Sequence, residues 1–116
     1  MSDCIFCKIV RGEIPSKKVY EDDDLLAFND INPARPVHVL VIPKKHITSL
    51  ASVPEADVAV LGKMLAKANE IAVAQGSPDG FRVIINTGRV GGQEVGHLHA
   101  HIVGGPDPVG PMLKRI

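Results

Sequence analysis

Three of the chain's five histidines stand at alternate positions, His97, His99 and His101, with small or apolar residues between them. In a strand, successive side chains point to opposite faces, so this spacing predicts that the three imidazoles share one face. Imidazole titrates near neutral pH and can act as an acid, a base, a nucleophile or a metal ligand. The stretch therefore predicts a metal site or a histidine-centred reaction site. An ordinary polar strand face is the disfavoured alternative, because it would more naturally carry Lys, Glu or Thr.

A second chemical motif, Cys4-x-x-Cys7, lies near the N-terminus. Structural zinc sites need four nitrogen or sulfur ligands, and C-x-x-C is a common half of such a site, so two further ligands would have to come from elsewhere. The alternatives are a pair of reduced, buried cysteines or a redox motif, although a redox C-x-x-C normally opens a helix after a strand. Two cysteines are too few for the disulfide framework of a secreted domain.

The strands that must position these residues are indicated by apolar runs between turn residues. A short helix is expected over 4–10, because apolar residues recur there at helical spacing before Gly12 and Pro15. Strands are expected at 18–21, 25–30, 37–42, 81–86 and 97–103. The run 37–42 is apolar on both faces, which is typical of a central strand covered on both sides.

One long helix is expected between the early and the late strands. Ser52-Val53-Pro54-Glu55 has the form of a capping box, so the helix should begin near Val53 and run for about twenty residues to Gly76. Its core stripe is expected to comprise Val58, Leu61, Leu65, Ala68 and Ala72. These elements predict an α+β fold with an antiparallel sheet of about five strands, one long helix and a short N-terminal helix.

Length and charge set further bounds. The 116 residues predict a single domain, 1–116, with a flexible C-terminal tail from about residue 106. Thirteen acidic and thirteen basic side chains give no net charge, so a nucleic-acid partner is not expected. No apolar run approaches the roughly 20 residues that span a bilayer, and Asp3 and Lys8 are polar where a signal peptide would be apolar. We therefore expect a cytoplasmic protein with a small-molecule partner and no membrane association.

The segment from His97 to Val103 resembles the signature of the histidine triad (HIT) superfamily. Four neighbouring segments resemble its Hint branch, the histidine triad nucleotide-binding proteins: Phe28-Asn29-Asp30-Ile31, His38 to His46, Gly91-Gly92-Gln93-Glu94-Val95 and Gly104-Gly105. The resemblance extends in order from Cys4 to about Leu113. It implies a homodimeric α+β protein that binds purine nucleoside monophosphates, with an AMP or GMP moiety, and hydrolyses phosphoramidates without an organic cofactor.

The resemblance also implies roles for individual residues. His99 matches the nucleophile, and His101 and His38 match the histidines that assist at the phosphate. The other matched positions are Asn86, Gln93 and Glu94 for phosphate, Asp30 for the ribose, Ile5, Phe6, Ile9, Phe28 and Ile31 for the base, and Cys4, Cys7, His46 and His97 for a structural zinc ion. Many relatives have serine at position 94. A carboxylate there repels phosphate unless its backbone faces the ligand, and it could favour a cationic amine leaving group.

Competing functions come from different classes. A metal-dependent hydrolase could use the alternating histidines as zinc ligands, and its turnover would then be sensitive to chelators. A non-catalytic nucleotide-binding regulatory module is a second alternative, and a dinucleoside polyphosphate hydrolase or phosphorylase is a third. A galactose-1-phosphate uridylyltransferase is less favoured, because that group usually has glutamine where this chain has His101. A homodimer is expected in addition, since one helix cannot cover every apolar face of the strands 37–42 and 81–85.

Overall fold

Five antiparallel strands form one open sheet in the computed structural model, which describes residues 4–111 of the chain. The strands are β1 (Lys18–Glu21), β2 (Leu25–Asn29), β3 (Val37–Pro43), β4 (Arg82–Ile84) and β5 (Ala100–Gly104). Their order across the sheet is β1-β2-β3-β5-β4, and every neighbouring pair is antiparallel. The expected α+β architecture, with about five antiparallel strands, is therefore confirmed.

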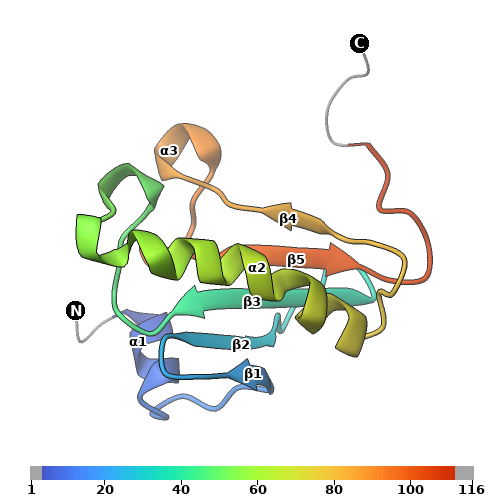
Figure 1. Cartoon of the computed structure of the whole chain (residues 1–116), viewed down its shortest axis with the longest axis horizontal. Helices are drawn as coiled ribbons and strands as arrows, with labels where there is room; N and C mark the ends of the chain where they lie inside the picture. The colour runs from blue at the N-terminus through green and yellow to red at the C-terminus, as the bar shows by residue number, and fades with distance from the viewer. Residues whose placement is uncertain (1–3, 112–116) are drawn as a thin grey trace.

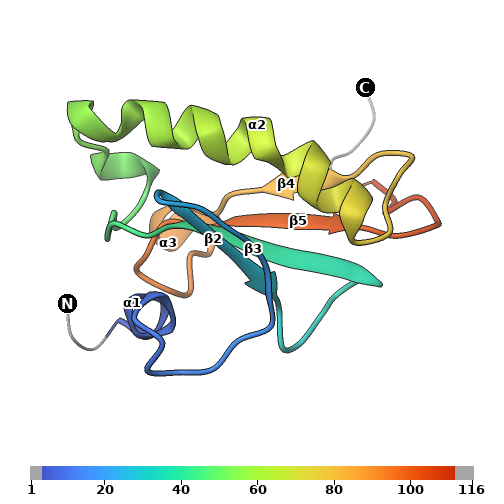
Figure 2. The ribbon, with the colours of Figure 1, turned by 60° about the horizontal axis from the view of Figure 1, so that its bottom comes forward.

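Two helices cover opposite faces of this sheet. The long helix α2 (Val58–Ala74) lies on one face and the short helix α1 (Ile5–Val10) lies near the other (Figures 1 and 2). The core accordingly has two parts, one that includes Met64 and Ile71 of α2 and one that includes Phe6 and Ile9 of α1. All seven residues of β3 are buried, as expected for a strand covered on both sides.

The predicted start of the long helix is wrong. Two single 3-10 turns, Leu50–Ser52 and Glu55–Asp57, precede α2, and the capping box does not form. Proline disfavours the helical conformation in the residue before it, and Val53 is indeed extended, with φ −95° and ψ 117°. The hydroxyl of Ser49, rather than that of Ser52, accepts a hydrogen bond from the backbone N–H of Ala51 at 3.0 Å.

The predicted core stripe of this helix is only partly correct. Ala68 and Ala72 are buried, but Val58 and Leu65 are 51% and 54% exposed. Met64 and Ile71, at 2% and 3%, take their places in the core. The helix has 17 residues and ends at Ala74, before the expected cap at Gly76. The stripe that faces the sheet is therefore centred on Met64, Ala68 and Ile71, next to the predicted stripe on the helix surface.

The alternation around the histidines holds, although β5 begins only at Ala100. Leu98, Ala100 and Ile102 belong to the core beneath α2, whereas the rings of His97 and His99 pack against Phe6 from the other side. The loop before them contains a one-turn helix, α3 (Gly88–Gly91), which the sequence did not predict. It ends at Gly92, whose φ of +76° is the left-handed conformation that favours glycine.

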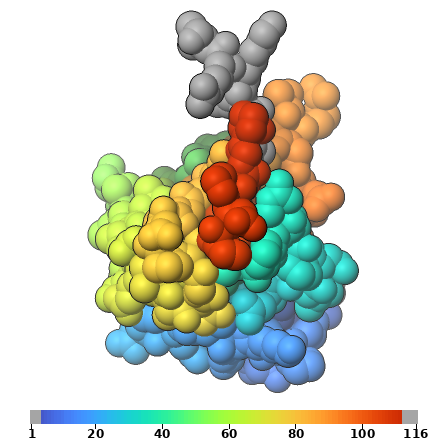
Figure 3. All heavy atoms as spheres, turned by 90° about the vertical axis from the view of Figure 1, so that its right-hand side faces the viewer, coloured from blue at the N-terminus to red at the C-terminus, as the bar shows by residue number. Residues whose placement is uncertain are grey.

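The segment after β5 runs back over the surface. In Figure 3 it lies between the turn that follows α2 and the segment before β3. The guanidinium of Arg35 donates a hydrogen bond to the carbonyl of Val109 at 3.1 Å, and that of Arg82 donates to the carbonyl of Gly110. The rest of the predicted tail, 112–116, lies outside the described residues. Over residues 4–111, no helix combines the length and the apolar character needed to cross a membrane.

Candidate active site and metal centre

His38 and His101 meet across the two central strands. The register pairs Leu40 with His101 and His38 with Val103, so the two histidines are diagonal neighbours on one face. His38 Nε2 lies 2.9 Å from His101 Nδ1. The backbone N–H of Ala34 donates to His38 Nδ1 at 2.9 Å, which leaves the proton of a neutral His38 on Nε2. His38 then donates to His101 Nδ1, and His101 keeps its own N–H on Nε2.

A second backbone contact determines the tautomer of His99. Its Nδ1 lies 2.8 Å from the carbonyl oxygen of His97, which can only accept, so in the neutral ring Nδ1 carries the proton and Nε2 has the free lone pair. The His99 ring is 6% exposed and stands 5.1 Å from the His101 ring, centroid to centroid. An imidazole with a free Nε2 thus lies beside one that offers an N–H. This is the arrangement that nucleophilic attack on a phosphorus atom and stabilisation of its oxygens require.

A cavity of about 260 Å³ opens in front of these two histidines. Its walls are mostly apolar and come from α1, the segment after it, the end of β2 and the loop before β5. The lining residues are Ile5, Phe6, Ile9, Ile14, Pro15, Ser16, Phe28, Asn29, Asp30, Ile31, Leu40, Glu94, Val95, His99 and His101. A neighbouring hollow of about 560 Å³ shares the wall from Asn29 to Ile31. An apolar cleft with a few convergent polar groups is the usual form of a small-molecule site.

Asp30 stands where the apolar part of the cavity meets the histidines. Its Oδ1 accepts a hydrogen bond from the backbone N–H of Asn32 at 2.8 Å, and its Oδ2 lies 3.5 Å from His38 Nε2. The backbone N–H of Asp30 also donates to the carbonyl of His38 at 3.0 Å, so both the main chain and the side chain are held beside β3. The carboxylate retains acceptor capacity toward the cavity.

The charge state of His101 follows from its surroundings. Burial lowers the pKa of His101, and the neighbouring His99 and His38 lower it further, whereas the carboxylates of Asp30 and Glu94 act in the opposite direction. The net result is a lowered pKa, so His101 is neutral at neutral pH. This agrees with the hydrogen bond that it accepts from His38, since a doubly protonated ring could not accept one.

Three predicted phosphate contacts occupy different positions. Glu94 lines the cavity, but Asn86 and Gln93 are not among the described residues that do so. The Asn86 amide donates to the carbonyl of Gly91 at 2.8 Å. The Gln93 amide donates to the carbonyls of Thr48 and Val95 at 2.8 and 2.9 Å, and its oxygen accepts from Gly88 N–H. These two side chains therefore hold the loop before β5 in shape.

Cys4, Cys7, His46 and His97 form a separate cluster behind His99. One donor atom from each lies within 4.8 Å of the other three. Their sulfur to Nδ1 distances are 3.3 Å for Cys4 and His97, 3.2 Å for Cys7 and His46, and 3.6 Å for Cys7 and His97. A tetrahedral zinc ion with ordinary bond lengths would separate a sulfur and a nitrogen ligand by about 3.6 Å. The donor set and its spacing therefore fit a zinc ion.

The surroundings of the cluster fit the same group. His97 is fully buried, and its Nε2 donates to the carbonyl of Pro43 at 2.8 Å, which leaves Nδ1 free to face the sulfurs, as in many metal-bound histidines. Burial is the main cause that lowers the pKa of His97. Burial, together with the neighbouring Cys4, raises the pKa of the Cys7 thiol, an environment that a bound cation would reverse. His97 and His46 are thus separate from His99 and His101 at the cavity and from His38 beside them.

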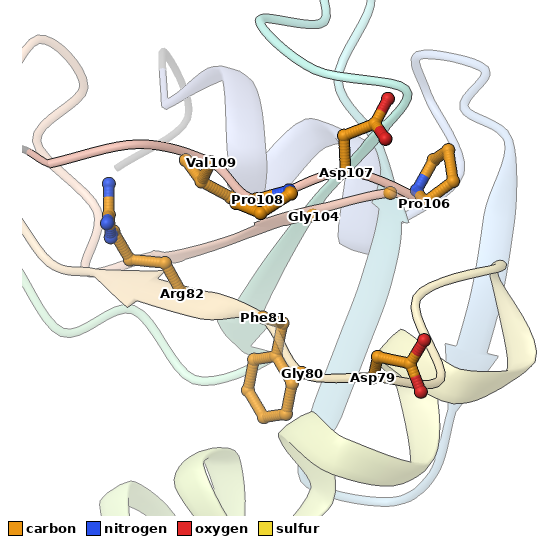
Figure 4. A pocket seen from close by; sticks show the side chains of 10 residues that line it. Asp79, Gly80, Phe81, Arg82, Gly104, Pro106, Asp107, Pro108 and Val109 are labelled. Carbon is orange, nitrogen blue, oxygen red and sulfur yellow. The ribbon is translucent and has the colours of Figure 1, made fainter.

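A further hollow, of about 450 Å³, lies at the other end of the sheet. The turn from Asp79 to Arg82 and the segment 104–109 line it. In Figure 4 the Arg82 side chain lies on one side of this hollow, while Asp79 and Asp107 lie on the other. The charged groups do not converge on a common point, and the described residues around it include no histidine or cysteine. The hollow therefore lacks the features of a reaction site.

Several residues at the reaction site were not predicted from the sequence. Ile14, Pro15, Leu40 and Val95 line the cavity, and Ala34 determines the tautomer of His38 through its backbone N–H. Leu40 could have been found, because it lies two residues after His38 on the same face of a predicted strand. Ala34 acts through its main chain, so its side-chain type carries no signal.

The family model described as HIT domain matches residues 11–107. Protein HitA of Neisseria gonorrhoeae is 56% identical over 106 residues, which cover 91% of this chain and 99% of HitA. The purine nucleoside phosphoramidase of Escherichia coli is 48% identical over 114 residues, covering 97% and 95% of the two chains.

Solved structures are similar over nearly the whole fold. A histidine triad protein from Clostridium difficile has a TM-score of 0.88 and 52% identity, with 96% of this chain and 97% of that one covered. A Zn-bound histidine triad family protein from Mycobacterium smegmatis has a TM-score of 0.77 and 35% identity, with 93% and 78% covered. Since the family model spans most of the chain and close relatives cover it almost entirely, the chain belongs to the histidine triad family.

Proposed function

We propose that this HIT-family nucleotide hydrolase is a purine nucleoside phosphoramidase, which cleaves the P–N bond between a nucleoside 5′-phosphate and an amine. The observation that carries the proposal is the hydrogen bond from His99 Nδ1–H to the His97 carbonyl at 2.8 Å, because it selects the tautomer whose lone pair is on Nε2, beside the cavity. A neutral imidazole is a competent nucleophile toward phosphorus.

The reaction would proceed in two displacements. His99 Nε2 forms a bond to phosphorus while the P–N bond to the substrate's amine breaks, and the amine leaves with a proton taken from the solvent. Water then attacks the phosphorus of the nucleotidyl-histidine, its oxygen stays on the phosphate, one of its protons returns to the solvent, and His99 is released with its proton still on Nδ1. Across both steps one water is consumed, and one amine and one nucleoside monophosphate are produced.

The other cavity residues take roles that fit their positions. His101 Nε2–H donates to a phosphate oxygen as negative charge builds there, and His38 holds His101 in the required tautomer. Asp30 accepts hydrogen bonds from the ribose hydroxyls. The purine, of AMP or GMP type, lies among Ile5, Phe6, Ile9, Phe28 and Ile31. In this arrangement Asn86 and Gln93 shape the phosphate loop, and Glu94 faces the leaving group.

The comparisons support this choice of substrate class. The E. coli relative, 48% identical over 97% of this chain, is a purine nucleoside phosphoramidase. The cavity agrees with a nucleotide, since its lining combines apolar side chains, the Asp30 carboxylate and two histidines. Hydrolysis of dinucleoside polyphosphates would use the same nucleophile, so a direct substrate comparison has to distinguish the two activities.

The test compares the wild type and His99→Ala on adenylate and guanylate phosphoramidates, dinucleoside polyphosphates and nucleotide sugars. We expect the wild type to hydrolyse the phosphoramidates fastest. The His99→Ala variant should lose turnover by at least about 10⁴-fold while still binding AMP, because Asp30 and the apolar wall remain. Near-normal turnover in this variant would refute the nucleophile assignment, and preferential cleavage of a dinucleoside polyphosphate would refute the substrate class.

A structural zinc ion on Cys4, Cys7, His46 and His97 is part of the same proposal. The geometry of the four donor atoms supports it, and the M. smegmatis relative is Zn-bound. Such an ion would tie the N-terminal helix to the loops at His46 and His97 and would contribute folding free energy. We expect about one zinc per chain in protein purified without added metal, and its loss together with stability in Cys7→Ser. A fully stable, metal-free wild type would contradict this.

A cytoplasmic homodimer completes the proposal. Among the described strands, β4 lies at the edge of the sheet beside β5, and Val58, Leu65 and Val73 leave an exposed apolar face on α2. A second copy could cover both by a two-fold contact. The free cysteine pair fits a reducing compartment. Light scattering at micromolar concentration should give twice the chain mass of 12.4 kDa, and a monomer would refute the dimer.

A further inference from the structure

Helix α1 belongs to both sites at once. Cys4 lies at its N-cap and Cys7 within its first turns, so the helix contributes both thiols of the metal cluster. Ile5, Phe6 and Ile9 of the same helix line the nucleotide cavity. This six-residue helix and its N-cap residue therefore carry two of the four cluster residues and a wall of the cavity.

The helix is too short to keep its place unaided. Isolated helices below about 12 residues are marginal in water, so tertiary contacts must hold α1 on the sheet. These contacts fall into two groups. The thiols meet His46 and His97, and the side chains of Phe6 and Ile9 join the apolar core on that side of the sheet. Both groups must act together to fix the distance between α1 and the opposite wall of the cavity.

Phe6 is where the two groups of contacts meet. Its ring lies edge-on to three others, with centroid separations of 5.9 Å to His97, 5.2 Å to His99 and 5.6 Å to Phe28. It is 6% exposed and stands between the two cysteines in sequence. Edge-to-face contacts of this kind depend on orientation. A shift of α1 at the thiols would therefore move the ring that packs on a metal ligand, on the nucleophile and on the base wall together.

We propose that metal binding at the Cys/His cluster and purine binding in the cavity are coupled through α1, with Phe6 as the positioning residue. This inference rests on the proposed function, because it takes the apolar cavity wall to be the base site. A metal that holds Cys4 and Cys7 fixes α1 against the base, and a bound base in turn holds α1 where the thiols complete the metal site. The two affinities must then change by the same factor, since such coupling is reciprocal.

The chemistry of the wall determines which part of the ligand takes part. Ile5, Phe6 and Ile9 are apolar and suit a purine ring, whereas phosphate and ribose meet the histidines and Asp30. AMP should therefore be coupled to the metal, and ribose 5-phosphate, which lacks the base, should not. This difference separates coupling through α1 from general stabilisation, because any ligand that binds only the folded protein would raise metal affinity in proportion to its own binding.

The experiment measures the equilibrium zinc affinity of the full chain against a calibrated chelator, alone and with each ligand at the same multiple of its dissociation constant. With AMP we expect zinc affinity to rise about tenfold, and with ribose 5-phosphate less than twofold. In the reverse direction, removal of zinc should weaken AMP binding by about tenfold. If the zinc-free chain unfolds, AMP and ribose 5-phosphate at the same multiple of their dissociation constants should raise zinc affinity equally, and this result would overturn the coupling through α1.

Two variants on the same helix serve as a matched pair. Phe6→Leu keeps an apolar side chain but loses the ring edges, so the tenfold effect of AMP on zinc affinity should fall below threefold. Ile5→Ala lies on the cavity side of α1 and is 46% exposed, so it should weaken AMP binding yet leave the coupling factor unchanged. An equal loss of coupling in both variants would overturn the role of Phe6.

The outcomes separate this inference from the proposal on which it rests. If AMP binds but leaves zinc affinity unchanged, or if ribose 5-phosphate has the same effect as AMP, coupling through α1 is wrong while the nucleotide site stands. If the zinc-loaded protein does not bind AMP at all, the proposed function fails and this inference fails with it.

Discussion

Two substitutions at His38 separate the two hydrogen bonds that this residue makes. Its Nδ1 accepts from the Ala34 N–H, and its Nε2 donates to His101 Nδ1, each at 2.9 Å. The amide nitrogen of a glutamine reaches about as far as histidine Nε2, so His38→Gln keeps a donor to His101. The oxygen of an asparagine overlies histidine Nδ1, so His38→Asn keeps the acceptor for Ala34 but removes the donor.

The magnitude follows from what the donor does for His101. A hydrogen bond into Nδ1 makes the Nε2–H of the same ring a stronger donor toward phosphate, because linked hydrogen bonds polarise one another. Without the donor at position 38, the neutral His101 ring can carry its proton on Nδ1 instead, and the hydrogen bond from its Nε2–H to the charged phosphate, of about 1.5–3 kcal/mol, is then lost. At 1.36 kcal/mol for each factor of ten, His38→Asn should lower kcat by about 10- to 150-fold. His38→Gln should remain within about fivefold of the wild type, because its donor is retained.

The assay is steady-state hydrolysis of an adenylate phosphoramidate, with thermal unfolding measured on the same samples. KM should change little in either variant, because the base and ribose contacts are untouched. His38→Gln should be the less stable of the two by about 1 kcal/mol, since it leaves the Ala34 N–H without its acceptor. If His38→Asn turns over as fast as His38→Gln, the inferred path from Ala34 through His38 to His101 is wrong.

Asp22→Asn should lower the free energy of unfolding at pH 7 by about 1–2 kcal/mol, and the exposed neighbour variant Asp23→Asn should have little effect. Burial acts to raise the pKa of Asp22, but hydrogen bonds from a tyrosine hydroxyl, two backbone N–H groups and a lysine lower it on balance. The stabilisation is thus fully present above the pKa of the unfolded chain, about 4, and is lost as the pH falls below it. Urea unfolding should therefore show a smaller stability difference between the wild type and Asp22→Asn at pH 3 than at pH 7, and an unchanged difference would contradict this. Gly104→Ala should cost about 2–3 kcal/mol, since a new Cβ would overlap the buried Ser77 hydroxyl. In thermal unfolding, adding Ser77→Gly to Gly104→Ala should restore part of the lost stability. If it restores none, the overlap with Ser77 is not the cause of the loss. Because the pKa of His101 is lowered, kcat/KM should be flat from pH 8 down to about 6.5 and decline only below that, whereas a midpoint above 6.5 would count against a neutral His101.

The sequence was most informative where local pattern and tertiary structure agree. The apolar run of β3 and the alternation around His99 both predict which side chains are buried, because a strand has a strict period of two. The start of α2 was less predictable. Ser52 and Glu55 match a capping pattern, but Pro54 forces an extended residue before it, and this backbone restriction prevails over the favourable cap.

The candidate site, too, could be predicted only in part. His99 and His101 line one cavity, with His38 bonded to His101, and His46 and His97 lie with the cysteines. The roles that the family resemblance implies for these residues stay predictions. The tautomers could not be predicted, because main-chain groups of Ala34 and residue 97 determine them. Asn86 and Gln93 were expected at the phosphate, yet their amides face the loop backbone, a choice that depends on the path of α3.

Residue 97 serves the two sites through different parts of itself. Its imidazole faces the cysteines, whereas its carbonyl oxygen holds the proton of His99. Every amino acid supplies that carbonyl. The proposed reaction therefore requires the backbone at position 97 but not a histidine there, and the side chain of this first histidine of the triad belongs to the proposed zinc site. A homologue that does not bind the metal could have other residues in place of Cys4, Cys7 and His97 and still keep the nucleophile.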